Sequence, residues 1–240
     1  MAKKITWRSA SLLEMKLYLI RHGQSVANKQ RHDVKKMPDP DLTEKGILQA
    51  QLTADWLYQH DYYSSLYGAT KRQLSPHAIY CSPTRRGLKT AKAIASRFGV
   101  IVGIDVWLHE VGGADSEDGL LWGGLPRADA LELVEYGRFT RDYPPLGWWF
   151  QKVETQKDAM RRASAWLNEL KVKHGKDDVV IAIGHGALFD CLAAIAFEQL
   201  NQITWMSMHN AAVARMDLDN DVWKLVFWNQ SEHLREVLSY

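Results

Sequence analysis

Short apolar runs alternate along the chain with longer segments of helical character. The short runs have the length of strands and lie at residues 15–20, 78–81, 100–107 and 178–183. The longer segments are predicted to be helices and lie at residues 43–60, 82–98, 153–170 and about 186–200. Two final runs, 211–218 and 222–228, are typical of a hairpin. This alternation predicts a three-layer α/β/α sandwich with a mainly parallel sheet.

Two parts of the chain depart from this alternation. Residues 111–150 hold seven of the 16 glycines and three of the seven prolines, and a short helix is expected only at 128–136. We therefore expect an irregular insertion within a single domain of residues 15–240. Residues 1–14 precede the first strand and are expected to form an N-terminal extension.

Composition and charge exclude several function classes. The chain has 240 residues with 46% hydrophobic and 24% charged positions, which are ordinary values for a globular protein. A net charge of +2 is too balanced to predict bulk binding to nucleic acid or membranes. The N-terminus lacks the apolar core of a signal peptide, so a cytoplasmic location is expected. The two cysteines, Cys81 and Cys191, are far apart and predict neither a disulfide scaffold nor a metal site.

Candidate catalytic residues follow three of the predicted strands. Arg21 and His22 end the first strand, Arg85 begins the helix after the second, and His185 follows the run at 178–183. The carboxyl ends of parallel strands meet at one edge of a sheet, so these side chains are expected to lie together. Arginines hold phosphoryl groups by charge-assisted hydrogen bonds, and a neutral imidazole is a competent nucleophile. The set therefore indicates phosphoryl transfer through a phosphohistidine, with no cofactor and no metal.

A lone histidine is more often a satisfied core residue than a catalytic group. Here both His22 and His185 follow a strand and precede a glycine, which favours the catalytic interpretation. A cysteine phosphatase would need an arginine six residues after Cys81, but that position is Gly87. Arg86 is expected to be solvent-exposed, although its position next to Arg85 leaves the assignment of the two open.

The candidate residues lie in segments that resemble the signature motifs of the histidine phosphatase, or phosphoglycerate mutase-like, superfamily. The segments occur in the order that the family has and cover about residues 15–230. They are YLIRHGQSVAN (18–28), LTEKG (42–46), YCSPTRRGLKTA (80–91), LHEVGG (108–113) and IAIGHGALFD (181–190). The resemblance implies the phosphoglycerate mutase-like fold.

The resemblance also implies a role for each residue. His22 would attack phosphorus and become phosphohistidine. Arg21, Arg85 and His185 would surround the phosphoryl oxygens. Glu110 would protonate the leaving oxygen and later activate water. The substrate-binding set that the resemblance implies is Arg21, Asn28, Arg85, His185, Gln24, Ser25 and Gly186.

Two departures from the mutases of the family favour a phosphatase. Those mutases typically have Glu after Arg-His-Gly and a Tyr-Gly-x-Leu-x-Gly run after the catalytic Glu. This chain has Gln24 and, after Glu110, Val-Gly-Gly-Ala-Asp. The expected function is hydrolysis of a small phosphorylated metabolite. A phosphoglycerate mutase-like phosphotransferase is the alternative. A non-catalytic interaction domain ranks third, because such a domain would not need the intact set of arginines and histidines.

Two further hypotheses concern the surroundings of the site. The chain has ten tryptophans, and Trp148 and Trp149 lie in the insertion, where they would form a lid or simply pack on the body of the protein. A basic segment follows the first histidine and would either attract phosphorylated substrates or be a solvated loop. Its cations are Lys29, Arg31, Lys35 and Lys36.

Overall fold

The computed structural model describes most of the expected domain. The described residues are 15–30, 39–59, 74–112, 124–135, 137–148, 154–199 and 206–239. The expected extension at 1–14, Trp149 and most of the basic segment lie outside them.

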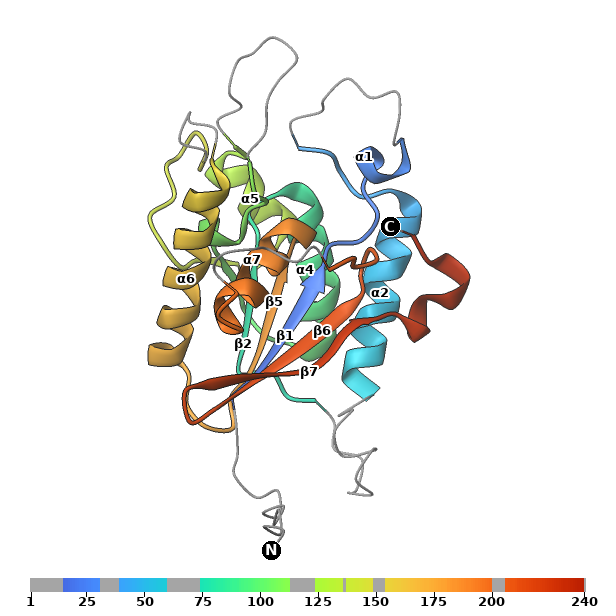
Figure 1. Cartoon of the computed structure of the whole chain (residues 1–240). Coiled ribbons are helices and arrows are strands. Elements are labelled where there is room, and N and C mark those ends of the chain that lie inside the picture. Colours follow the sequence, from blue (N-terminus) through green and yellow to red (C-terminus); the bar gives the residue numbers. More distant parts are fainter. Residues whose placement is uncertain are drawn as a thin grey trace, which may run out of the picture.

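Within the described residues, seven strands form one mixed sheet in the order β4-β3-β2-β5-β1-β6-β7 (Figure 1). The first five in that order are parallel to one another, and β6 pairs antiparallel with both β1 and β7. Their bounds are Met15–Arg21 (β1), Ala78–Cys81 (β2), Val102–Ile104 (β3), Arg138–Phe139 (β4), Val179–Gly184 (β5), Val213–Asp219 (β6) and Val222–Gln230 (β7). The mainly parallel sheet that the sequence predicts is confirmed.

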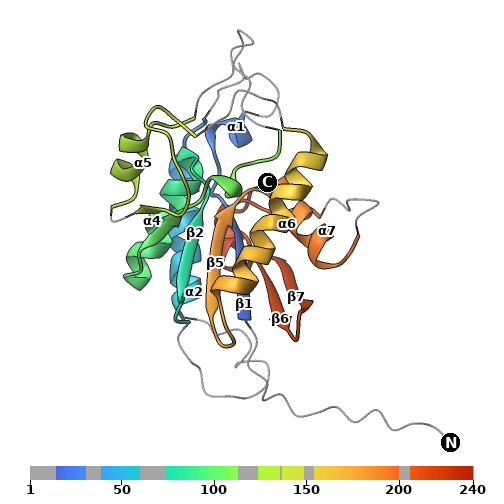
Figure 2. The same cartoon turned by 90° about the vertical axis from the view of Figure 1, so that its left-hand side faces the viewer.

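Four helices cover the two faces of the sheet. They are α2 (Glu44–Gln59), α4 (Arg85–Phe98), α6 (Gln156–Lys173) and α7 (Gly186–Ala196). Figure 2 shows α2 and α4 on one side of the sheet and α6 and α7 on the other. Successive strand residues point to opposite faces, so Tyr18 and Ile20 are buried with α2 and α4, whereas Leu17 and Leu19 are buried with α6 and α7. The three-layer α/β/α sandwich is therefore confirmed.

The described parts of residues 111–150 join this core. Helix α5 (Arg127–Leu133) buries Ala130, and strand β4 extends the sheet beside β3. Tyr143 and Trp148 are buried in the same apolar cluster as α4. The segment is thus less irregular than its glycines and prolines suggest. Strand β4 could not be predicted, because a two-residue strand is too short to show an apolar alternation.

Several element boundaries differ from the expected ones, and side-chain caps explain two of the differences. The helix after β2 begins at Arg85 because Thr84, rather than Ser82, caps it by accepting a hydrogen bond from the Gly87 amide. The expected strand at 100–107 ends early because Asp105 caps the short 3-10 helix η1 (Val106–Leu108). The remaining short elements are α1 (Val26–Lys29) and the 3-10 helix η2 (Glu232–Val237).

Candidate active site

Adjacent parallel strands bring the candidate residues to one edge of the sheet. Strands β1 and β5 are paired so that Arg21 lies opposite Gly184, and β2 pairs with the other side of β5. His22 follows β1, and His185 follows β5 as the residue before α7. The imidazole rings of His22 and His185 lie with centroids 5.1 Å apart. The structure therefore brings together the two histidines that are 163 positions apart in sequence.

His22 is held as a neutral imidazole with one nitrogen facing the site. Its Nδ1 lies 2.7 Å from the Gly23 carbonyl oxygen, which can only accept, so Nδ1 carries the proton. The Arg86 Nε donates to His22 Nε2 at 3.2 Å, which requires a lone pair there. Burial, and then the nearby cations Arg86 and Arg21, hold the pKa of His22 well below its usual value. The result is an uncharged imidazole at neutral pH.

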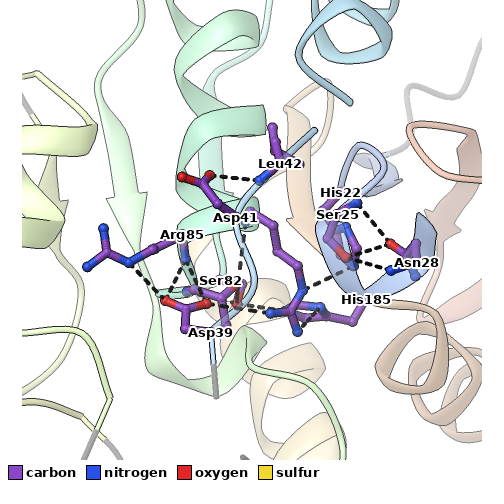
Figure 3. A network of polar contacts seen from close by, with 12 residues as sticks. His22, Ser25, Asn28, Asp39, Asp41, Leu42, Ser82, Arg85 and His185 are labelled. Atoms are coloured by element: carbon purple, nitrogen blue, oxygen red, sulfur yellow. Dashed lines mark hydrogen bonds and ion pairs between the residues drawn. The ribbon is translucent and has the colours of Figure 1, made fainter. Parts of the chain in front are cut away.

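His185 adopts the complementary arrangement. Its Nε2 lies 2.8 Å from the Ser82 hydroxyl oxygen (Figure 3). The Arg86 Nη2 lies 3.4 Å from its Nδ1. Burial and the Arg86 cation also lower the pKa of His185 far below its usual value. Arg86 therefore contacts both histidines with a single guanidinium group.

The arginine at this position is Arg86 and not Arg85. The Arg85 guanidinium points away from the histidines, and its nearest acidic partners are Asp39 at 3.8 Å and Asp129 at 4.0 Å (Figure 3). Its side chain is 39% exposed, against 13% for Arg86. The expectation that Arg86 is solvent-exposed is wrong, and so is the expectation that the Arg85 side chain lies together with the histidines. Because the cap is Thr84, Arg86 is the second residue of α4, and its side chain turns toward the strand ends.

Asp39 is a site residue that sequence reasoning missed. Its carboxylate accepts the Arg85 backbone amide at 3.1 Å and lies 3.5 Å from Arg86 Nη1. The side chain is 4% exposed, and this burial raises its pKa to about 6 despite the two arginines. Asp39 therefore anchors both the start of α4 and the guanidinium that contacts the histidines. Nothing in the local pattern before the LTEKG segment marks it, because its partners are more than 40 positions away.

The Glu110 carboxyl group is buried and held by two backbone amides. Its Oε1 accepts hydrogen bonds from the backbone amides of Val111 at 2.9 Å and Leu188 at 3.1 Å. The second contact fixes the carboxyl group against the first turn of α7. Burial raises the pKa of Glu110, although Arg86 and the two amides act in the opposite direction. A carboxyl group in this state can deliver a proton to a leaving oxygen.

A family comparison agrees with this geometry. The model of the histidine phosphatase superfamily (branch 1) matches residues 17–231. The chain belongs to that superfamily. The matched range contains the residues that cluster at the strand ends and excludes only the two ends of the chain.

Two curated relatives of this histidine phosphatase are named as phosphatases. A protein of Hydrogenobacter thermophilus named "Putative phosphoserine phosphatase 2" is 25% identical over 222 residues, which are 92% of this chain and 98% of that one. A glucosyl-3-phosphoglycerate phosphatase of Mycolicibacterium vanbaalenii is 26% identical over 236 residues and covers 90% of this chain and 95% of its own. Both names favour phosphatase over mutase.

A solved structure shows the same fold. A phosphoserine phosphatase mutant from Entamoeba histolytica, in complex with phosphoserine, superimposes with a TM-score of 0.60 at 20% identity. The match covers 92% of this chain and 99% of that one. The phosphoglycerate mutase-like architecture is thereby confirmed.

A cavity of about 840 Å³ opens next to the two histidines, since Arg21 and Gly186, their neighbours in sequence, line it. Its walls include the side chains of Arg21, Asn28 and Glu110, and Gly186 lies at the first turn of α7. The Arg21 guanidinium also donates to the Met208 carbonyl oxygen, which ties it to the chain that follows α7. The cavity is therefore bordered by one cationic and one carboxyl side chain.

Asn28, Gln24 and Ser25 were expected as substrate ligands, but their contacts differ. Asn28 lines the cavity, and its Oδ1 accepts from the Ser25 hydroxyl at 2.9 Å and from Asn210 Nδ2 at 3.1 Å. The Gln24 amide oxygen instead accepts from the Thr43 hydroxyl at 2.9 Å. Ser25 caps α1. Asn28 thus remains a candidate ligand, whereas Gln24 and Ser25 hold the loop in shape.

The loop after His22 packs closely on the start of α2. A Cβ atom at Gly23 would lie 2.3 Å from the Gly46 carbonyl oxygen, and one at Gly46 would lie 2.1 Å from the Gln24 carbonyl oxygen. Only glycine at both positions allows this approach. The glycines of the RHG and LTEKG motifs are therefore explained by one backbone contact.

Trp148 packs against the body of the protein. It is 5% exposed, its ring lies 5.1 Å from that of His109, and a Cβ at Gly124 would lie 2.8 Å from its indole. This burial favours packing over a lid for Trp148, while Trp149 lies outside the described residues.

Two features are absent from the described part of the chain. No helix there is long and apolar enough to cross a membrane. No group of three or more His, Cys, Asp and Glu side chains there is placed to hold a metal ion.

Proposed function

We propose that this protein hydrolyses phosphate monoesters of small metabolites through a phosphohistidine on His22. The observation that carries the proposal is the state of His22, a neutral imidazole whose Nε2 lone pair accepts a hydrogen bond from the Arg86 guanidinium. The names of the relatives support hydrolysis rather than a mutase reaction.

In the first step, His22 Nε2 attacks phosphorus as the bond from phosphorus to the ester oxygen breaks. Glu110 gives its proton to that oxygen, so the leaving group departs as an alcohol. Arg21 and Arg86 neutralise the charge on the equatorial phosphoryl oxygens, which is the main requirement of phosphoryl transfer. His185, held by Ser82, adds a hydrogen-bonding group on the same side.

In the second step, the Glu110 carboxylate takes a proton from water. The water oxygen attacks phosphorus, and the bond from phosphorus to His22 Nε2 breaks. Inorganic phosphate leaves, His22 is again neutral and Glu110 is again protonated. The two arginines supply the positive charge throughout, and on this basis we propose that catalysis is metal-independent.

We further propose that the substrates are small phosphorylated metabolites of the cytoplasm and that nucleic acid is not a substrate. The net charge of +2 and the names of the relatives support this class.

Alkaline quenching within milliseconds of mixing is expected to trap the phosphoenzyme. The panel is phosphoserine, 3-phosphoglycerate, glucose 6-phosphate and p-nitrophenyl phosphate, each with and without EDTA. We expect a phosphoryl group that is stable to alkali and labile to acid, that decays in seconds as phosphate appears, and that EDTA leaves unchanged. A phosphoenzyme that survives for minutes in water would contradict hydrolysis and favour the mutase alternative.

Replacing Glu110 with glutamine is expected to slow phosphorylation according to the leaving group. The phosphorylation rate in single turnovers should fall about 10²-fold or more with 2-hydroxyethyl phosphate, whose alkoxide must be protonated. With p-nitrophenyl phosphate the fall should be several-fold, because nitrophenolate leaves without a proton. Glu132→Gln, an exposed change on α5, is the matched control. Equal losses with both esters would argue against Glu110 as the acid.

A further inference from the structure

Asp190 is a carboxylate of the cavity to which the proposed reaction assigns no role. It lies on α7 four residues after Gly186, so both positions share one face of the helix. Both line the cavity together with Arg21 and Glu110. Asp190 is 5% exposed, which is low for an acidic residue that borders a cavity.

The contacts of Asp190 hold its carboxylate in place without neutralising it. Its Oδ1 accepts a hydrogen bond from the backbone amide of Met206 at 3.1 Å. No lysine, arginine or histidine within the described ranges forms a direct ion pair with it, and the Arg21 cation acts on it only from a greater distance and lowers its pKa. Burial raises its pKa to about 6, so it is mostly ionised at neutral pH. A buried anion of this kind is costly unless a cation joins it.

The other charged groups of the cavity are already engaged by the reaction. Arg21 lines the cavity and binds the phosphoryl oxygens in the proposed reaction, and the raised pKa of Glu110 favours the neutral acid before the first step. Asp190 then remains as a negative charge toward the part of the substrate that departs as alcohol. A second anionic group on that part would be repelled, whereas a cation would be attracted.

We propose that Asp190 is a specificity-determining residue that pairs with a protonated amine on the leaving alcohol of the substrate. This inference rests on the proposed function and narrows it to phosphomonoesters of amino alcohols and related amines. A hydroxyl group could also donate to the carboxylate, but it would leave the buried charge uncompensated. The preference for an amine over a hydroxyl of the same size is therefore the property to be measured.

The experiment compares matched esters that differ only in this group. The substrates are 2-aminoethyl and 2-hydroxyethyl phosphate, together with 3-aminopropyl and 3-hydroxypropyl phosphate, and the readout is the amine-to-hydroxyl ratio of kcat/KM at pH 7.5. We expect a ratio of about ten or more for at least one chain length, as for a hydrogen bond to a charged group. In Asp190→Asn, which keeps the shape of the side chain, the ratio should fall to about one.

Two further variants separate pairing from general effects. Glu198→Gln removes the same charge from an exposed position just after α7 and should leave the ratio unchanged. Asp190→Ser should repeat the result of Asp190→Asn, and retained turnover of the hydroxyalkyl esters would show that both variants are folded.

The inference and the proposed function fail in different ways. A ratio near one for the unsubstituted protein, or a ratio that Asp190→Asn leaves unchanged, would overturn the role of Asp190 while hydroxyalkyl turnover continues. A larger loss with the hydroxyalkyl esters in Asp190→Asn would overturn it in favour of hydroxyl recognition. Turnover of no ester at all, with no phosphoenzyme, would overturn the proposed function and this inference with it.

Discussion

Replacing His22 with alanine is expected to abolish turnover, with a loss of about 10⁴- to 10⁶-fold in kcat with every phosphate ester. The reason is that the variant lacks the atom to which the phosphoryl group is transferred. The remaining arginines and Glu110 would still bind the ester, so KM should change much less than kcat. Phosphate release and phosphoenzyme trapping are the two measurements, and the variant should form no phosphoenzyme.

A competing nucleophile lies close by, so the test must identify the phosphorylated residue. The His185 ring is 5.1 Å from that of His22 and is also held neutral. Peptide mapping of the trapped phosphoenzyme is expected to find the phosphoryl group on His22, and His185→Ala should still form it, only more slowly. A phosphoryl group on His185 would reverse the two roles. His77→Asn, at the opposite end of β2, controls for the loss of a histidine and should retain full activity.

The position of the site could be predicted because it depends on two local signals. Apolar runs locate the strands, and chemistry-bearing residues directly follow them at His22 and His185. Parallel pairing then brings the ends of β1 and β5 together whatever the loops between them do. This inference does not need the register between neighbouring strands. The three layers and the pairing of the two histidines could therefore both be predicted from the sequence.

Contacts between distant segments could not be predicted in this way. Asp39 has no local periodicity or motif of its own, and its importance comes from Arg85 and Arg86, more than 40 positions away. Strand β4 has two residues and pairs with β3 across the insertion. In both cases the deciding interaction is tertiary, and it leaves no trace in the pattern of the segment itself.

The choice between Arg85 and Arg86 depended on one helix cap. Adjacent helical residues point about 100° apart, so moving the cap by a few positions changes which side chain faces the strand ends. Ser82 followed by Pro83 resembles a helix start, but the Thr84 hydroxyl accepts from the Gly87 amide and sets the boundary. The Ser82 hydroxyl is instead used by His185. A serine that is engaged by a distant histidine cannot be distinguished from a cap by sequence alone.

Replacing Arg86 with alanine is therefore expected to lower kcat/KM about 10³-fold or more, as for the loss of an arginine that stabilises a transferring phosphoryl group. Arg85→Ala, on the neighbouring position of the same helix, should change it by less than about threefold, because that guanidinium is partly exposed and surface ion pairs contribute little. Arg86→Lys keeps the charge but not the Nε contact with His22 and should be intermediate. The ester 2-hydroxyethyl phosphate serves for all three variants.

Titration of His22 gives a second readout for the same variant. Burial and then the Arg86 cation lower the pKa of His22, so removing the cation should raise that pKa. An imidazole with a higher pKa is protonated at a higher pH. The acid limb of the pH profile of kcat/KM should therefore move to higher pH in Arg86→Ala. The shift should be smaller in Arg86→Lys, which keeps a positive charge. NMR titration of the ring would measure the pKa directly. If Arg85→Ala proved the more damaging change and shifted the His22 titration, the assignment of Arg86 to the phosphoryl site would be wrong.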